Sequence, residues 1–240
     1  MNLSQLREEV CYANRMLPVL GLVTMHSGNA SGYDPDSQRV VIKPSGVDYD
    51  SLTPGMLVEV DVTTGAVVSG RLRPSVDLPH HLYLYRNIPG IRGIVHTHSN
   101  FATAFAAVHA AVPLCLTAIA DEFGGEIPCA PYVDNQGDHI GEAILRHRTE
   151  APAILLGNHG VFAWGPSPKA ALKAAAMTED TARTVHLAMQ IGKPRMIPPE
   201  EAAKWFARYH STYGQATSPE APPLRVIEPD TSRPNQREAA

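Results

Sequence analysis

Gly93-Ile94-Val95-His96-Thr97-His98-Ser99-Asn100 is the stretch that decides the fold of this chain. Its first residues are apolar and β-branched, which predicts the end of a buried strand. Side chains two positions apart in a strand project from the same face, so His96 and His98 are expected to point together. Two imidazoles on one face of a rigid strand form half of a site for a divalent metal ion. Because a chain with 11 histidines can contain such a pair by chance, the hypothesis depends on further ligands.

A third histidine follows a second apolar run, in Gly157-Asn158-His159-Gly160. The segment is typical of a hairpin turn, since Asn and Gly tolerate positive φ. The flanking glycines also let His159 reach back toward a neighbouring strand. Three imidazoles with an open coordination position would hold Zn²⁺ or Mn²⁺ as a Lewis acid.

Asp77, in Pro74-Ser75-Val76-Asp77-Leu78-Pro79, is the candidate for a fourth ligand. The same position suits an N-cap residue of the helix that we predict from Asp77 to Arg86. A carboxylate beside three neutral imidazoles could also complete the metal site and then yield to substrate. Both interpretations of Asp77 stay open at the level of local sequence.

Three short polar segments predict a phosphate site. Turns with free backbone N–H groups and hydroxyls near a helix N-terminus bind phosphate, and a lysine adds positive charge. The candidate phosphate-binding residues are Gly28, Asn29, Lys43, Ser45, Gly46 and Ser75. Each segment alone is weak evidence, but together, beside a metal constellation, they favour a phosphorylated substrate.

Hydrophobic periodicity organises the rest of the chain into alternating helices and strands. Helices are predicted over residues 3–18, 77–86, 101–111, 168–191 and 200–209, and strands over 39–43, 56–61, 66–70, 93–97, 153–156 and 161–164. From residue 216 the chain is rich in Pro, Ser and Glu without periodicity. We therefore predict one α/β domain over residues 1–215 and a Pro-rich disordered tail over 216–240.

Composition excludes several classes of function. The 240 residues are 44% hydrophobic and 18% charged, as in an ordinary globular protein with a buried core. A net charge of −4 and a pI near 6.2 give no basic surface for nucleic acid. No apolar run approaches the length of a membrane span, and the N-terminus has no apolar signal core. Three well-separated cysteines, Cys11, Cys115 and Cys129, are typical of thiols in a reducing compartment, so we expect a cytoplasmic protein.

Taken together, these residues resemble the class II aldolase/epimerase family, which also contains the adducin head domain. The similarity extends from the first predicted helix to Gln215. Its markers are Gly28-Asn29, Ile42-Lys43-Pro44-Ser45-Gly46-Val47, Ser75 with Asp77, His96-Thr97-His98-Ser99, Asn158-His159-Gly160 and Tyr213-Gly214-Gln215. The Lys-Pro-Ser-Gly-Val-Asp-Tyr segment, Asp121 and the Tyr-Gly-Gln ending resemble the L-ribulose-5-phosphate 4-epimerase branch. The resemblance implies a central, mainly antiparallel sheet flanked by helices in three α/β/α layers.

The resemblance also implies a role for each marker residue. His96, His98 and His159 match the family's metal ligands, and Asp77 matches its carboxylate ligand. The six candidate phosphate-binding residues match positions that hold substrate phosphate. Asp121 and Tyr213 match an acid/base pair supplied by a neighbouring subunit, which implies a homotetramer with active sites at subunit interfaces. The implied activity interconverts L-ribulose 5-phosphate and D-xylulose 5-phosphate by cleaving and re-forming the C3–C4 bond.

Two departures from the epimerase pattern keep alternatives open. Val76 stands where epimerases usually have a second serine, and the segment before Tyr213 is short. The alternative function is a related lyase, either an aldolase or a decarboxylase that passes through a similar enediolate. A non-catalytic role, as in the adducin head domain, conflicts with the complete set of three histidines. Zinc, manganese and cobalt all suit such ligands, and zinc is the expected metal.

Overall fold

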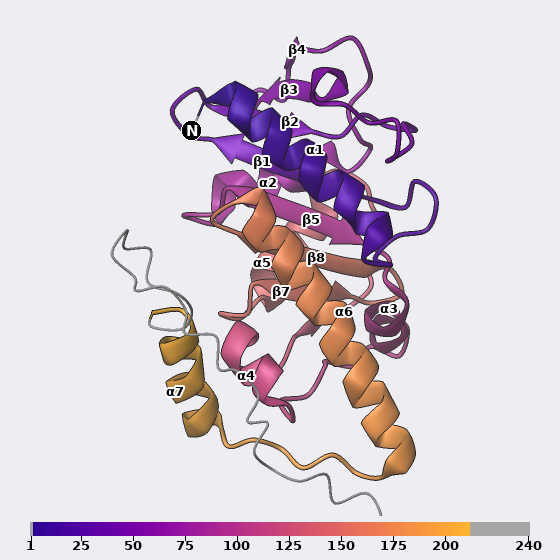
Figure 1. Ribbon diagram of the computed structural model, residues 1–240, viewed down its shortest axis with the longest axis vertical. Coiled ribbons are helices and arrows are strands. Elements are labelled where there is room, and N and C mark those ends of the chain that lie inside the picture. The colour runs from indigo at the N-terminus through magenta and orange to yellow at the C-terminus, as the bar shows by residue number, and fades with distance from the viewer. Residues whose placement is uncertain (1, 212–240) are drawn as a thin grey trace, which may run out of the picture.

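Eight strands form one sheet in the order β4-β3-β2-β1-β5-β8-β7-β6 in the computed structural model, which describes residues 2–211 (Figure 1). Every neighbouring pair runs antiparallel except β6 and β7, which are parallel. The strands are β1 (Gly28–Asp34), β2 (Arg39–Ile42), β3 (Val58–Asp61), β4 (Val67–Ser69), β5 (Gly93–Thr97), β6 (Cys129–Ala130), β7 (Ala153–Leu156) and β8 (Gly160–Gly165). The predicted mainly antiparallel sheet is confirmed.

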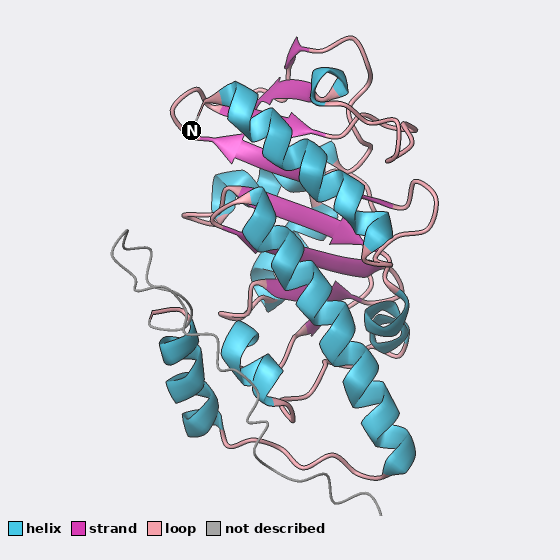
Figure 2. Ribbon diagram, viewed as in Figure 1, coloured by secondary structure: helices cyan, strands magenta, loops and turns pink. Residues whose placement is uncertain are grey.

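Helices cover both faces of this sheet, so the predicted three-layer arrangement is confirmed (Figure 2). They are α1 (Leu3–Val19), α2 (Leu78–Asn87), α3 (Asn100–Ala107), α4 (Thr117–Phe123), α5 (His139–His147), α6 (Pro168–Ile191) and α7 (Pro199–Tyr209), with a short 3₁₀ turn η1 (Pro54–Met56). Helices α1 and α6 lie on one face, against β1, β5 and β8, while α2 and α5 lie on the other. None of the helices within residues 2–211 combines the length and apolar character needed to cross a membrane.

The alternation of side chains along β5 explains why it separates two cores. Val95 belongs to the core under α1 and α6, whereas Ile94 belongs to the core under α2 and α5. Both side chains are fully buried. His96 follows Ile94 at strand spacing and so lies on the α2 side of the sheet.

The structure corrects two of the predicted elements and adds two helices. Gly28 and Asn29, predicted as a turn, are the first residues of β1, because β1 pairs with β2 on one side and β5 on the other. The helix predicted to reach residue 111 ends at Ala107, where Val108 is the C-cap and His109 has a left-handed φ of 54°. Helices α4 and α5 were not predicted, because each is short. In α5 the buried residues Ile140, Ala143 and Ile144 do follow helical spacing, so the sequence held a signal for this helix.

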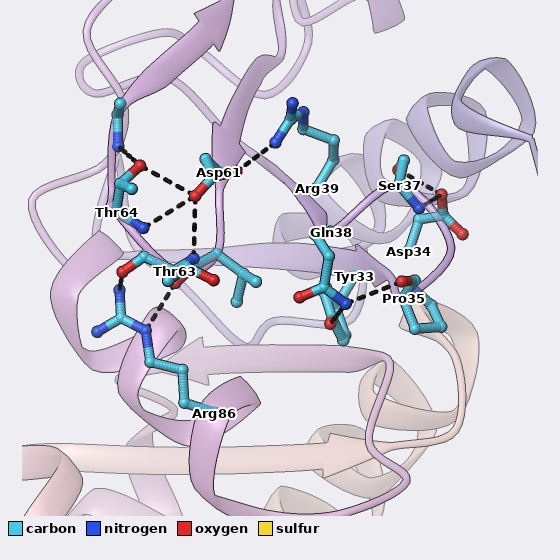
Figure 3. A network of polar contacts seen from close by, with 12 residues as sticks. Tyr33, Asp34, Pro35, Ser37, Gln38, Arg39, Asp61, Thr63, Thr64 and Arg86 are labelled. Atoms are coloured by element: carbon cyan, nitrogen blue, oxygen red, sulfur yellow. Dashed lines mark hydrogen bonds and ion pairs between the residues drawn. The ribbon is translucent and has the colours of Figure 1, made fainter.

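Side-chain hydrogen bonds hold the β1–β2 turn and the β3–β4 turn (Figure 3). Asp61 accepts from the backbone N–H groups of Thr63 and Thr64 and pairs with Arg39 on β2. Gln38, with a left-handed φ of 55°, donates to Tyr33 in the β1–β2 turn. These contacts fix the register of strands β1 to β4, which in turn positions the start of β1 beside β5.

Candidate metal centre

β5 places His96 in the middle of the sheet, between β1 and β8. Its side chain is 2% exposed and its ring stacks on Phe162 with 4.4 Å between centroids. His96 Nδ1 lies 2.9 Å from the carbonyl oxygen of Val161, which can only accept a hydrogen bond. Nδ1 therefore carries the proton, and the lone pair of Nε2 is free to bind a metal ion.

The other two histidines converge on His96. The Nε2 atoms of His98 and His96 are 3.0 Å apart, and one ring nitrogen from each of the three histidines, including His159, lies within 4.8 Å of the others. His98 follows directly after β5, whereas His159 comes from the turn between β7 and β8. The structure thus brings together the three histidines that the sequence singled out.

Glycine at position 160 permits this convergence. A Cβ atom there would lie 2.4 Å from the carbonyl oxygen of Thr97 and 2.8 Å from Cδ2 of His98. No larger residue fits without moving β8 away from β5. The glycines around His159 serve close packing, in addition to the turn that we predicted.

Burial keeps all three imidazoles neutral near pH 7. It lowers the pKa of His96 to about 4, with further lowering from the other two histidines and opposition from Asp77. Burial is also the largest cause of the lowered pKa values of His98 and His159. Neutral imidazole is the form that binds metal, so the site is ready for an ion without first losing protons.

The donor set fits a divalent transition metal. Three imidazole nitrogens around one point, with room for a fourth ligand, match the ligand type and number of catalytic zinc sites and also suit manganese or cobalt. The side chains alone do not select among these metals.

Asp77 lies outside the cluster of three ring nitrogens but interacts electrostatically with His96, so its role as a fourth ligand stays a prediction. Asp77 is the N-cap residue of α2, but its side chain makes no capping hydrogen bond. Instead Oδ2 accepts from Asn29 Nδ2 at 2.6 Å. Burial tends to raise the pKa of Asp77, but His96, His81 and the Asn29 hydrogen bond outweigh it, so the pKa is lowered. The carboxylate is therefore ionised and held at the edge of the metal centre.

Two loop segments pair next to Asn29 and assemble most of the predicted phosphate site. Ser45 N–H donates to the carbonyl oxygen of Arg73, and Ser75 N–H donates to that of Lys43, each at 2.9 Å. Asn29 Nδ2 is 3.1 Å from Ser75 Oγ, which ties both segments to β1. The N–H groups of Ser45 and Ser75 are thus already used, contrary to the expectation of free backbone donors. Side chains must supply the binding of an anion at these two positions.

Lys43 is the charged member of this group. It is 2% exposed, and its Nζ lies 3.3 Å from the carbonyl oxygen of Pro44 and 4.8 Å from the ring centroid of Tyr49. Burial lowers the pKa of Lys43, with partial opposition from Asp48. A buried ammonium with one hydrogen bond has further donors to offer to an anion.

The two remaining phosphate candidates are glycines with backbone roles. Gly28 donates its N–H to His26 and accepts from Tyr49 Oη through its carbonyl oxygen. A Cβ at Gly28 would lie 2.7 Å from the carbonyl oxygen of His96, so glycine is required for β1 to approach β5. Gly46 has a left-handed φ of 69°, which turns the chain after Ser45.

The predicted acid/base residues are not part of this cluster. Asp121 lies on α4 and lines a separate surface pocket between α4 and α7, together with Thr117, Trp205, Arg208 and Tyr209. Tyr213 falls outside the described residues. The roles assigned to these two residues remain predictions.

His81, which is not among the candidate site residues named from the sequence, belongs to a buried polar network. His81 is fully buried, and its Nδ1 lies 2.7 Å from Ser31 Oγ, which is 2.8 Å from Tyr85 Oη. Asp77, His81 and Tyr85 are four residues apart, so one face of α2 contacts β1. That spacing was the signal in the sequence that could have revealed the network.

Comparison with known proteins gives a consistent result. Residues 8–186 match the model of the class II aldolase and adducin N-terminal domain family. L-Ribulose-5-phosphate 4-epimerase UlaF of Salmonella paratyphi B is 39% identical over 229 residues, covering 89% of this chain and 100% of the relative. Among solved structures, an L-fuculose 1-phosphate aldolase has a TM-score of 0.78 at 26% identity, covering 86% of this chain and 96% of that one. YgbL of Klebsiella pneumoniae, suggested to be an aldolase, epimerase or decarboxylase, has a TM-score of 0.75 at 27% identity, covering 85% and 99%.

Proposed function

The chain belongs to the class II aldolase and adducin N-terminal domain family, and from this membership we propose that it is a metal-dependent epimerase interconverting L-ribulose 5-phosphate and D-xylulose 5-phosphate. The observation that carries the proposal is the convergence of His96, His98 and His159. Similarity to an L-ribulose-5-phosphate 4-epimerase over nearly all of the chain supports this choice of substrate.

The chemistry of the substrate explains why such a site is needed. The C4 proton of a keto sugar is not acidic, so direct deprotonation at C4 is unfavourable. Cleavage of the C3–C4 bond by retro-aldol reaction would leave an enediolate, and a divalent ion held by His96, His98 and His159 would supply the positive charge that stabilises it. The aldehyde fragment turns its other face and recondenses, which inverts C4. Each face needs its own proton donor or acceptor at the C4 oxygen.

Residues of this chain fill the remaining roles. Lys43 and the side chains of Ser45 and Ser75 hold the phosphate, because the segments that carry them pair with each other and Ser75 contacts Asn29, which also binds Asp77. Asp77 is held by Asn29 beside the metal, where it can complete the resting site or move a proton.

The acid/base pair is Asp121 and Tyr213, contributed by a neighbouring subunit of a homotetramer. The position of Asp121 on α4, in a pocket apart from the histidines of its own chain, supports such a contribution in trans. Exposed apolar side chains stand next in sequence to residues of the site: Val76, 78% exposed, precedes Asp77, and Val108, 72% exposed, follows the end of α3. Exposed apolar side chains of this kind favour a protein interface.

A metal-dependence assay with L-ribulose 5-phosphate tests this function. The chelator-treated protein should be inactive, and added Zn²⁺, Mn²⁺ or Co²⁺ should restore formation of D-xylulose 5-phosphate. Activity that survives complete metal removal would contradict the proposal.

The second candidate function is aldol cleavage of a small sugar phosphate or keto acid. It is favoured by Val76, which follows Ser75 of the proposed phosphate site, is exposed and has no hydrogen-bond donor in its side chain. A panel of phosphorylated and unphosphorylated sugars, scored for epimer and for released aldehyde, separates the two candidates.

Val76→Ser gives a directional test of the bound phosphate. A new hydroxyl donor to a charged acceptor is worth about 1.5–3 kcal/mol, so the KM for a phosphorylated ketose should fall by about tenfold or more. Val67→Ser, on the exposed edge strand β4, is the matched control and should leave KM unchanged. If Val76→Ser lowers turnover of the true substrate, the site is not built for phosphate and the lyase gains support.

A further inference from the structure

Helix α3 follows His98 in the chain and contacts, through its last turn, the distant segment that carries His159. It begins at Asn100, two residues after His98, and its C-terminal end meets the turn that carries His159. The last carbonyl groups of any helix have no partner within the helix and must be satisfied from outside. In this protein a residue next to a proposed metal ligand contacts two of them.

Asn158 makes these contacts. Its backbone N–H donates to the carbonyl oxygen of Ala106 at 3.0 Å, and its Nδ2 lies 3.4 Å from that of Ala107. His109 Nε2 lies 2.5 Å from Asn158 Oδ1, an oxygen that only accepts. The side chain of Asn158 is thus held between the end of α3 and His109, which lies two residues beyond it.

Both partners adopt a backbone conformation in which glycine is usual. Asn158 has φ of 57° and His109 has φ of 54°. The N–H of Ala110 bonds to the carbonyl oxygen of Phe105, which is the Schellman arrangement with His109 in the position that glycine commonly takes. Glycine would adopt both conformations more easily. The mutual hydrogen bond is what the Asn and His side chains add.

The contact also restrains the turn from its other side. A Cβ at Gly157 would lie 2.9 Å from Cε1 of His109 and 2.8 Å from the backbone nitrogen of Tyr132. The His109 ring therefore packs on the backbone just before Asn158. His159 is one residue away, so the orientation of its imidazole depends on how this turn sits on α3.

We propose that Asn158 is a positioning residue for His159, with His109 as its support, and that α3 acts as a strut holding the two histidine-bearing segments at a fixed separation. The inference rests on the proposed metal site and goes beyond it, because neither residue is a ligand. Strong metal binding in this protein then depends on hydrogen bonds made to the end of a helix.

Glycine substitutions separate positioning from folding. Asn158→Gly and His109→Gly remove the side-chain contact and place the residue best suited to each φ, so both apoproteins should fold. Gln38→Gly is the matched control, because Gln38 has φ of 55° and side-chain hydrogen bonds of its own at the opposite end of β1 (Figure 3). Asn158→Asp is the conservative variant, since Asp keeps the acceptor for His109 and tolerates this backbone conformation.

The measurements are Zn²⁺ affinity by chelator competition, the visible spectrum of the Co²⁺-loaded protein and thermal unfolding of the apoprotein. Asn158→Gly and His109→Gly should each weaken Zn²⁺ binding by about tenfold and alter the Co²⁺ bands, as loss of a group supporting a metal ligand does. The double variant should bind Zn²⁺ only slightly more weakly than either single variant, because both substitutions remove the same hydrogen bond between Asn158 and His109. Asn158→Asp should fall between parent and glycine variant, and Gln38→Gly should match the parent.

The outcomes distinguish this inference from the proposed function. If the parent and His159→Ala bind Zn²⁺ equally, the metal site itself is wrong. If the parent binds Zn²⁺ through His159 but both glycine variants keep the parent affinity and Co²⁺ spectrum, Asn158 and His109 do not position the ligand. Should a glycine variant fail to fold, Asn158→Asp carries the test by the same two readouts.

Discussion

At the scale of single residues, His96 links the backbone of the sheet to the chemistry of the site. The carbonyl oxygen of Val161 holds one ring nitrogen, and Phe162 holds the plane of the ring. Because both partners lie on β8, the orientation of the imidazole depends on strand pairing and not on a flexible loop. Rigid placement of this kind favours tight metal binding.

His98→Ala should abolish metal binding and activity while the fold survives. The ligand lies at the end of β5 and is not required by either core. We expect a loss of Zn²⁺ affinity of more than about 100-fold, since loss of an outer supporting group alone costs about 10–100-fold. Elemental analysis and chelator competition measure this, with His147→Ala as the control, because His147 is an exposed residue at the end of α5. Full metal occupancy in His98→Ala would rule out the ligand assignment.

His81 predicts the pH dependence of stability. Burial lowers its pKa in the folded protein to about 3, below about 6.5 in the unfolded chain. As pH falls below 6.5, His81 becomes protonated in the unfolded chain but stays neutral in the folded protein. The free energy of unfolding therefore decreases progressively from pH 6.5 toward pH 3.

His81→Gln removes this titration while keeping a hydrogen-bonding side chain beside Ser31. The pH slope of the unfolding free energy of the apoprotein should become shallower by up to about 1.4 kcal/mol per pH unit between pH 4 and 6. Urea unfolding at several pH values measures it. The other buried histidines titrate in both proteins, so the difference reports His81. Equal slopes would show that His81 is protonated within the folded state.

At the scale of elements, the junction of β5 with α6 sets where the histidine strand lies. A Cβ at Gly93 would lie 2.3 Å from the carbonyl oxygen of Ser167 and 2.5 Å from the nitrogen of Pro168. These atoms belong to the N-cap and first residue of the longest helix, and main chain cannot move aside as a flexible side chain can. The start of β5 is therefore fixed by direct backbone packing.

Gly93→Ala should destabilise the protein by about 1–3 kcal/mol through overpacking. Gly55→Ala, in η1, is the matched control, because nothing lies within 4 Å of its Cβ position. The urea midpoints of the two variants measure the effect. A Gly93→Ala protein as stable as Gly55→Ala would mean that α6 can shift away from β5 at no cost.

At the scale of the whole molecule, the proposed active site draws on two subunits. The histidines and Lys43 come from one chain, and Asp121 on α4 comes from another, on the proposal above. The distance between α4 and the histidine strand within a single chain is visible in Figure 1. An assembly with shared sites allows two inactive variants to complement each other.

Mixing His98→Ala with Asp121→Asn should restore activity. After dissociation and reassembly in equal amounts, about a quarter of the sites would combine an intact histidine set with an intact Asp121. Each variant reassembled alone should stay inactive. Turnover of L-ribulose 5-phosphate measures the recovery. If the mixture stays as inactive as its components while hybrids form, Asp121 does not act across the interface.

Much of this protein follows from local sequence. The β-branched apolar residues before His96 predicted β5, and the long alanine-rich segment predicted α6. Both predictions were possible because the sequence pattern extends over the whole element. The motifs around the histidines indicated the family, which the comparisons confirm. The three histidines were also singled out from the sequence, and their rings do meet. Their role as ligands, the subunit arrangement and the role of Tyr213 stay predictions.

Only the tertiary structure decided the rest. Gly28–Asp34 has little strand propensity of its own and is a central strand because β2 and β5 pair with it on both sides. The N–H groups of Ser45 and Ser75 were expected to be free, but pairing between distant loops uses them. The contact of Asn158 with α3 joins residues about 50 positions apart. Local patterns determine which residues a strand or turn presents, but the partner of each hydrogen bond depends on how distant segments pack.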